Sequence, residues 1–287
     1  MSGYWKSIKK MNFKIGFSSC PNDTFIFEAL VNNRIESEGL NFNVLVTDVE
    51  ELNKLALNSE LDITKISIAT YPKISKEYLI LNSGSALGNK NGPILISKRT
   101  ITPDEINDLK IAIPGFNTTA NLLLSIAYPD ATDKVEYIFS EIEEAVLSGK
   151  TDAGLIIHES RFTYQAKGLK KIIDLGEFWE NKYHQLIPLG CIVMKRNFPV
   201  ETIKKINFLI NNSISYGYDH PDDSSAYIKK HSQELADDII KKHIGLYVNR
   251  YSVDLGKKGQ DSIRFLFKKG FESGYLPDIN KKIFIND

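Results

Sequence analysis

The chain has 287 residues, of which 42% are hydrophobic and 25% are charged, and its 36 basic residues balance its 36 acidic residues. That length suffices for one large domain or two lobes with a sizeable buried core. The zero net charge leaves no basic excess for a nucleic acid or an anionic membrane, so neither partner is expected. No stretch approaches the ~20 apolar residues of a membrane span.

The cysteines and the N-terminus exclude further classes. Two cysteines, Cys20 and Cys191, cannot form a disulfide framework, and they lack metal-ligand spacing. Both stand in apolar, strand-like contexts, where a free thiol usually behaves as a small buried hydrophobe. No motif for a metal, a phosphate or a dinucleotide is present. We therefore expect neither a metal nor a cofactor. The N-terminal segment lacks an apolar run of signal-peptide length, so we expect a cytoplasmic protein.

The first part of the chain alternates strands and helices. Apolar runs bounded by polar loops predict strands, and amphipathic spacing after a capping residue predicts helices. Asp48 is such a cap. In chain order we predict a strand at residues 14–18, a polar loop at 19–22 and a helix at 23–31. A strand at 43–47, a helix at 50–58 and two further strands at 62–67 and 78–82 follow.

The middle of the chain repeats this order. We predict a strand at residues 110–113, a polar loop at 114–117 and a helix at 118–126. A strand at 135–139, a helix at 142–147 capped by Ser140 or Glu141, and a strand at 152–157 follow. The second helix of each unit, with the residues that follow it, has a similar sequence: VEELNKLALNSELD in the first unit and IEEAVLSGKTD in the second. A repeated β-α-β-α-β unit predicts two similar lobes, each a parallel sheet with helices outside. Chance similarity between amphipathic helices is the alternative.

Two further segments, residues 92–99 and 188–196, each contain an apolar strand with Pro and Gly at its start and Lys-Arg at its end. We predict that they form a two-stranded hinge that takes the chain to the second lobe and back. Lobe 1 would comprise residues 1–97 and 197–287, and lobe 2 residues 98–196. The fold class is therefore α/β, with two similar parallel or mixed sheets. The C-terminal third is predicted helical at residues 200–216, 224–232, 235–242 and 260–273.

The predicted ligand cleft lies between the carboxyl ends of the two sheets and closes by hinge bending. The segment DAGLIIHE (152–159) predicts a buried strand that delivers His158 to this cleft, although a histidine there can also be structural. The matching strand end in the first unit carries Lys65, Ile66 and Ser67, which should face His158. A lysine within a buried strand requires that its ammonium reach the cleft or a carboxylate.

Other polar groups are predicted at helix starts that face the cleft. Thr118, Thr119 and Ala120 offer hydroxyls and free backbone N–H groups to a carboxylate, although ordinary capping explains threonine there equally well. The loop with Ser19 and Asn22 is similarly polar. The other histidines are expected on the surface: His184, His220, His231 and His243. One histidine among hydroxyls and amides suits proton abstraction without a cofactor.

Four motifs in order, SSCPNDTFIFEAL, DITKIS, PGFNTTANLLL and DAGLIIHESRFTY, resemble the 1,4-dihydroxy-6-naphthoate synthases of the futalosine route to menaquinone. The resemblance covers nearly the whole chain. It implies a type II periplasmic-binding-protein fold and cofactor-free conversion of cyclic dehypoxanthine futalosine, a small carboxylate, to 1,4-dihydroxy-6-naphthoate. It also implies that His158 is the proton acceptor and that residues 65–67 and 119–120 line the substrate.

Two other functions are compatible with these residues. A non-catalytic small-molecule binding protein would have the same two lobes. The chorismate dehydratase of the same pathway shares the fold as well, and the DAGLIIHE segment favours the synthase over it by resemblance. The sequence does not determine the oligomeric state.

Overall fold

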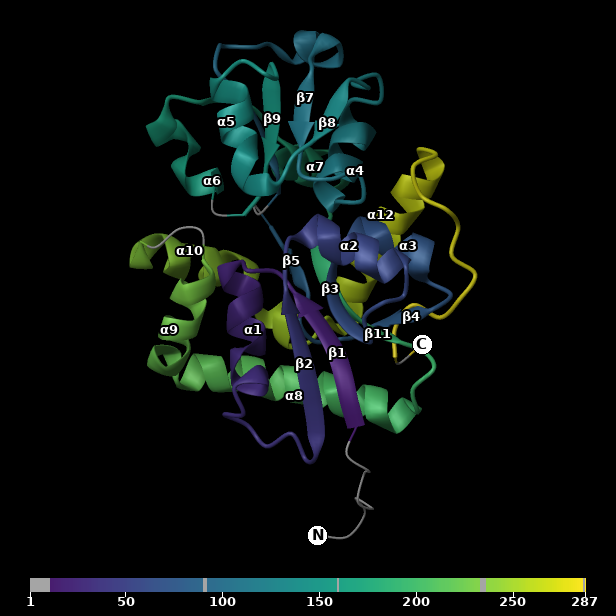
Figure 1. Cartoon of the computed structure of the whole chain (residues 1–287). Helices are drawn as coiled ribbons and strands as arrows, with labels where there is room; N and C mark the ends of the chain where they lie inside the picture. Colours follow the sequence, from purple (N-terminus) through teal and green to yellow (C-terminus); the bar gives the residue numbers. More distant parts are fainter. Residues whose placement is uncertain (1–10, 90–91, 159, 233–235, 286) are drawn as a thin grey trace.

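The computed structural model describes residues 11–89, 92–158, 160–232, 236–285 and 287. These residues form two lobes, each built on one β-sheet with helices against it (Figure 1). The lobe that contains the N-terminal strand is the lower one in Figure 1, and the lobe formed by the middle of the chain is the upper one. The predicted two-lobed α/β fold is confirmed.

The two sheets have related strand orders. Sheet A runs β2-β1-β3-β11-β4, with β5 paired to β11, and sheet B runs β10-β6-β9-β7-β8. The strands of sheet A are β1 (Met11–Phe17), β2 (Leu40–Val46), β3 (Ile63–Ser67), β4 (Tyr78–Ile80), β5 (Ala86–Gly88) and β11 (Ile187–Lys195). Those of sheet B are β6 (Ile94–Ser97), β7 (Ile111–Ile113), β8 (Lys134–Glu136), β9 (Ala153–Ile156) and β10 (Lys170–Asp174).

The helices divide between the lobes in the same way. Sheet A carries α1 (Pro21–Val31), α2 (Val49–Leu57), α3 (Tyr71–Ile74), α8 (Val200–Asp219), α9 (Pro221–His231), α10 (Asp237–Tyr247), α11 (Arg250–Val253) and α12 (Gly256–Glu272). Sheet B carries α4 (Thr119–Ala127), α5 (Ile142–Leu147), α6 (Ser160–Thr163) and α7 (Leu175–Tyr183). Within the described ranges, none of these helices is both long and apolar enough to cross a bilayer.

The internal repeat is confirmed in the backbone. Strand β1 is parallel to both β2 and β3, and β7 is likewise parallel to both β8 and β9. Equivalent aspartates bind equivalent amides: Asp62 accepts from the N–H of Lys14 and Asp152 accepts from the N–H of Lys110, both at 2.9 Å. The two aspartates therefore hold the starts of their strands, at the end of each sheet opposite the predicted cleft.

The predicted hinge is wrong. Strand β6 lies in sheet B, antiparallel to β9, and β11 lies in sheet A, antiparallel to β3, so the two strands do not pair. Residues 94–97 therefore join the second sheet and residues 187–195 the first, against the predicted boundaries at 97 and 196. The chain crosses between β5 and β6 and returns between α7 and β11. Each crossing ends in a strand that fills the open edge of a parallel β-α-β-α-β unit.

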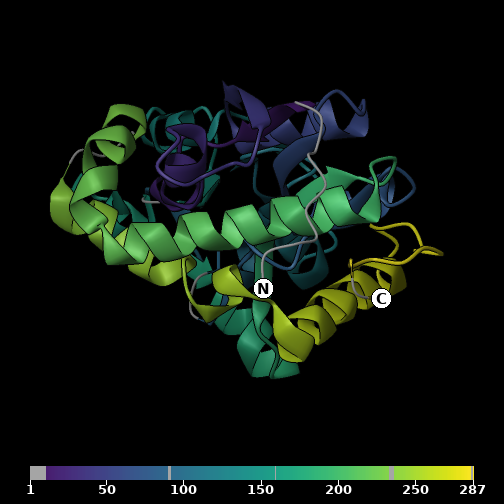
Figure 2. The ribbon, with the colours of Figure 1, turned by 90° about the horizontal axis from the view of Figure 1, so that it is seen from below.

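Two apolar layers enclose sheet A. One face packs against α1 and α8, the long helix that crosses the molecule in Figure 2, through Phe13, Ile15 and Ile210 among others. The opposite face packs against α12, and this cluster continues into the second lobe through Leu123 and Trp179 on α4 and α7. The lobes therefore share one apolar core on the side of α12.

The lobes also meet through polar groups of α2 on one side and of β8 and the loop before α4 on the other. The Lys54 ammonium lies 2.6 Å from a Glu136 carboxylate oxygen, and the Asn117 amide donates to Glu50 at 2.6 Å. Gly115, at φ +143°, allows this approach, because a Cβ there would lie 2.5 Å from the Glu50 carboxylate. Burial at this contact raises the pKa of Glu50.

Candidate active site

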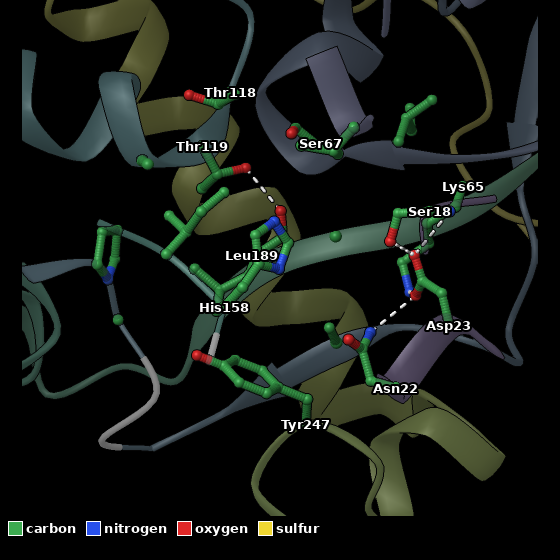
Figure 3. Close-up of a pocket in the computed structure, with 18 of the residues that line it drawn as sticks. Ser18, Asn22, Asp23, Lys65, Ser67, Thr118, Thr119, His158, Leu189 and Tyr247 are labelled. Atoms are coloured by element: carbon green, nitrogen blue, oxygen red, sulfur yellow. Dashed lines mark hydrogen bonds and ion pairs between the residues drawn. The ribbon is translucent and has the colours of Figure 1, made fainter. Parts of the chain in front are cut away.

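A pocket lies between the lobes, at the carboxyl ends of the parallel strands. Figure 3 shows side chains of both lobes converging on it. All predicted site residues except Ser19 are among those that line it. The lining residues are Ser18, Asn22, Asp23, Val49, Lys65, Ile66, Ser67, Ala86, Gly92, Pro93, Thr118, Thr119, Ala120, Ile157, His158, Leu189, Gly190, His243 and Tyr247.

The right-hand wall in Figure 3 is a buried ion pair from β3 and α1. The Lys65 ammonium lies 2.6 Å from an Asp23 carboxylate oxygen and also donates to the Gly84 carbonyl at 3.2 Å. Asp23 accepts further hydrogen bonds from the Ser18 hydroxyl at 2.6 Å and from the Asn22 amide at 2.7 Å. Lys65 therefore reaches both a carboxylate and the pocket, and the pair adds no net charge to it.

Ser67 and Ile66 have different roles at the end of β3. The Ser67 hydroxyl accepts a hydrogen bond from Asn53 at 3.2 Å, and none of the described residues accepts its own hydrogen. The Ile66 side chain belongs to the core that extends through α12. Neighbouring strand residues point to opposite faces, so Ser67 offers its hydroxyl while Ile66 anchors the strand.

The start of α4 presents backbone donors to the pocket. Thr118 is the N-cap, and its hydroxyl accepts from the N–H of Asn121 at 3.2 Å and donates to the Gly115 carbonyl. The Thr119 hydroxyl donates to the Leu189 carbonyl at 2.7 Å, the dashed bond near the centre of Figure 3. Within the described ranges, nothing accepts from the N–H groups of Thr119 and Ala120. These two N–H groups are available to an anion.

The Thr119 hydroxyl connects the lobes. Besides its bond to Leu189 on β11, it accepts from the N–H of Ala69 at 3.2 Å, and both partners belong to the first lobe. Thr119→Val keeps the shape and leaves the Leu189 carbonyl unpaired. We expect the free energy of unfolding to fall by about 1–3 kcal/mol, measured by urea denaturation. KM should change little, since the N–H groups of α4 remain.

Thr151→Val is the matched control. Thr151 is also buried, at 4% exposure, but its hydroxyl has no hydrogen-bond partner among the described residues. The same substitution there should not reduce stability. An unchanged unfolding free energy in Thr119→Val together with a raised KM would assign the hydroxyl of Thr119 to substrate instead.

His158 occupies the centre of the pocket in Figure 3. It lies two residues after the end of β9 at Ile156, and its backbone is left-handed, at φ +62°. Its Nδ1 lies 3.0 Å from the Cys20 sulfur, and its ring packs edge-on against Phe139 at 4.6 Å between centroids. Its Nε2 is buried and has no hydrogen-bond partner among the described residues. This nitrogen is available to a bound molecule.

The surroundings keep the imidazole of His158 neutral. Its pKa is lowered from 6.5 to about 4, mainly by burial; the charge of Asp23 opposes this shift and that of Lys65 adds to it. At neutral pH one ring nitrogen therefore carries a lone pair, which a general base requires. A group with a perturbed pKa in a cleft is a typical feature of a functional site.

The sequence-based prediction for His243 is wrong. This residue of α10 is fully buried, and its Nε2 lies 2.8 Å from the Asn22 amide oxygen. Because the Asn22 amide nitrogen donates to Asp23, its oxygen faces His243, and Nε2 of His243 must be the donor. Burial lowers the pKa of His243 well below its usual value. Tyr247, one helical turn further, also lines the pocket.

The sequence contained a signal for these two residues. Ile240, His243 and Tyr247 are spaced three and four apart, so they share the buried face of α10. This spacing predicts that His243 is buried together with its two apolar neighbours. What could not be seen in the sequence is that this face of α10 meets the start of α1.

Two expectations about the loop before α1 also change. Ser19 is half-buried and does not line the pocket, whereas Asn22 does. Cys20 is not in a strand: it is the residue before α1, which begins at Pro21 rather than near residue 23. Pro21 favours this earlier start because its fixed φ suits the first helical position. Cys191 lies within β11, as expected of a buried apolar residue.

Comparisons with known proteins agree with this arrangement. A family model described as menaquinone biosynthesis matches residues 13–272. The chain belongs to this family. Within the described ranges, no group of three or more His, Cys, Asp or Glu side chains is placed to hold a metal ion.

The curated relatives of this family member are named 1,4-dihydroxy-6-naphthoate synthase. The protein of Thermus thermophilus is 38% identical over 95% of this chain and 98% of its own length. That of Streptomyces coelicolor is 35% identical over 92% of this chain and 94% of its own. Such full-length similarity makes the chain an enzyme of the same family.

Solved structures support the fold. A protein of Archaeoglobus fulgidus superposes with a TM-score of 0.88 at 30% identity, covering 92% of this chain and 98% of its own. The alkanesulfonate-binding protein SsuA of Xanthomonas axonopodis, bound to MOPS, superposes with a TM-score of 0.72 at 11% identity, covering 95% and 96%. The second similarity shows the fold alone. The predicted periplasmic-binding-protein-like architecture is confirmed.

Proposed function

We propose that the chain converts cyclic dehypoxanthine futalosine to 1,4-dihydroxy-6-naphthoate, with His158 as the base. The observation that carries the proposal is a neutral histidine in a pocket between the lobes, whose buried Nε2 has no hydrogen-bond partner in the part of the chain that the structure describes. The family membership and the names of its relatives supply the chemical context. The low pKa of His158 keeps its lone pair available near pH 7.

Each pocket group has a place in the proposed mechanism. The N–H groups of Thr119 and Ala120 bind the ring carboxylate, and the positive end of α4 favours its charge. Lys65 is already paired with Asp23, which leaves the N–H groups at the start of α4 better placed to receive the acid group. The Ser67 hydroxyl donates to a sugar or ring oxygen.

The chemical step is an elimination. Nε2 of His158 removes a proton from the cyclised skeleton, and the bond to the sugar-derived fragment breaks. That fragment leaves with the electron pair, and the second ring becomes aromatic, which drives the reaction. His158 then gives its proton to the departing fragment or to water. The electrons stay within the substrate and its products, so the proposed step calls for a base and no redox cofactor.

Incubation of the purified chain with cyclic dehypoxanthine futalosine tests the proposal. We expect the naphthoate to accumulate, detected by absorbance and mass, over many turnovers. A binding protein would raise the melting temperature in the presence of the substrate and form no product. A parallel incubation with chorismate tests the alternative that the chain is a chorismate dehydratase. If the chain dehydrated chorismate and formed no naphthoate, the proposal would be contradicted.

A further inference from the structure

The contact between Cys20 and His158 joins the two lobes. Cys20 is the residue before α1, against sheet A, whereas His158 follows β9 of sheet B. The sulfur lies 3.0 Å from Nδ1. The proposed mechanism uses Nε2 of His158, not Nδ1, and it gives Cys20 no role. Its position against the base requires an explanation.

The orientation of the His158 ring is fixed by its backbone conformation and by two neighbouring side chains. Its left-handed backbone, at φ +62°, is rare for a residue other than glycine and persists where the surroundings impose it. Phe139 contacts the ring face-to-edge, and Cys20 contacts Nδ1. The other titratable groups around it are Asp23, Lys65 and the His243 ring, whose centroid lies 6.4 Å away. Of the two ring nitrogens, Nδ1 contacts the Cys20 sulfur, whereas Nε2 has no hydrogen-bond partner among the residues that the structure describes.

The proton on a neutral imidazole can occupy either nitrogen, and its partner decides which. If Nδ1–H points to the sulfur, Nε2 has a lone pair and can act as a base. If the thiol donates to Nδ1 instead, Nε2 carries the proton and cannot accept another. A thiol is both a weak donor and a weak acceptor, so it is compatible with the first arrangement.

We propose that Cys20 is a positioning residue, supplied by one lobe, that accepts the Nδ1 proton of His158 on the other lobe and thereby directs the Nε2 lone pair into the pocket. The inference rests on the proposed role of His158 as base. When Nε2 takes the substrate proton, Nδ1 keeps its own proton and still donates to sulfur. Cys20 remains a thiol throughout, and no oxidation occurs. The alignment of the base then depends on the relative position of the two lobes.

The first test needs neither substrate nor a variant of Cys20. Nitrogen NMR of the chain labelled with ¹⁵N-histidine distinguishes a protonated ring nitrogen from a bare one. His158→Asn identifies the signals of this ring by their disappearance. We expect Nδ1 of His158 to be protonated and Nε2 to be bare near pH 7. A protonated Nε2 overturns the inference.

The second test compares kinetics. For histidines that bind a metal, removal of the hydrogen-bond partner of the other ring nitrogen typically costs about 10–100-fold, and we take this range as the guide for His158. Cys20→Ala should therefore lower kcat by about that factor with little change in KM, and Cys20→Ser, which restores an acceptor, should recover part of the loss. Cys191→Ala is the matched control: it removes the other buried thiol, outside the pocket lining, and should keep the kcat of the original chain.

These outcomes separate the two proposals. If the original chain forms the naphthoate but Cys20→Ala folds and has an unchanged kcat, the role of Cys20 is wrong and the function stands. If the original chain forms no naphthoate, the proposed function is wrong, and the NMR result still decides the arrangement at Nδ1. If Cys20→Ala does not fold, the proton position in the original chain and the kcat of Cys20→Ser decide.

Discussion

His158→Asn should lower the single-turnover rate by about 10²–10⁴-fold, the usual contribution of a general base. Asparagine suits the test for a structural reason. The backbone of His158 is left-handed, at φ +62°, and asparagine is among the residues that tolerate this region best. Its amide also keeps polar atoms in the space of the ring but cannot accept a proton. The variant should therefore fold and bind substrate nearly normally.

His184→Asn is a matched control for this substitution. His184 also has a left-handed backbone, at φ +53°, at the end of α7, and it does not line the pocket. The control should keep the rate and the melting temperature of the original chain. A lowered melting temperature in His158→Asn, with a normal rate in the folded fraction, would assign His158 a structural role and contradict the mechanism.

The pH dependence should have the same origin. Because burial lowers the pKa of His158 to about 4, the rate of the original chain should stay level through neutral pH and fall only as pH drops through that value. An ordinary histidine would give a fall near 6.5. His158→Asn should lose this acid limb. Its residual rate should be independent of pH in that range.

Stability provides a second measure of the same group. Between pH 6.5 and about 4 the unfolded chain binds a proton at His158 that the folded chain does not. The free energy of unfolding therefore falls as pH drops through this window, and above the window His158 contributes no such loss of stability. His158→Asn removes this contribution, so its unfolding free energy should fall less steeply with decreasing pH.

The internal repeat was predictable because it rests on local patterns. Apolar periodicity and capping residues such as Asp48 and Thr118 mark each strand and helix within a few residues. Two units with the same order of elements must build similar sheets, since right-handed crossovers leave few alternatives. The sites at the strand ends then follow from topology, which is why Lys65, Ser67 and His158 were placed together correctly.

The sheet to which β6 and β11 belong was not predictable in this way. Each is a short apolar strand whose own sequence is compatible with either sheet. Its partner is chosen by the open edge of β3 or β9, which lies far away in the chain. The same limit applies to Cys20 and to His243, whose contacts with His158 and Asn22 join segments separated by more than a hundred residues.

Lys65→Met should be strongly destabilising. The side chains of Lys65 and Asp23 are 5% and 3% exposed, and their charged atoms lie 2.6 Å apart. Removal of the ammonium leaves a buried carboxylate without a counter-charge, and such a loss typically costs about 3–5 kcal/mol. Ser18 and Asn22 still donate to Asp23, so the chain should fold with a lower urea midpoint rather than not at all.

A double variant and a surface control make this prediction specific. Lys65→Met combined with Asp23→Asn removes both charges while the amide still accepts from Ser18, so it should be less destabilised than the sum of the single variants. Lys257→Met breaks the exposed pair with Asp261 and should cost no more than about 0.5 kcal/mol. Additive effects of Lys65→Met and Asp23→Asn would show that the pair is not coupled. A KM raised in the folded fraction of both Lys65→Met and the double variant would show that the ammonium also contacts the substrate, because the double variant leaves no unpaired Asp23 charge in the pocket to repel a carboxylate.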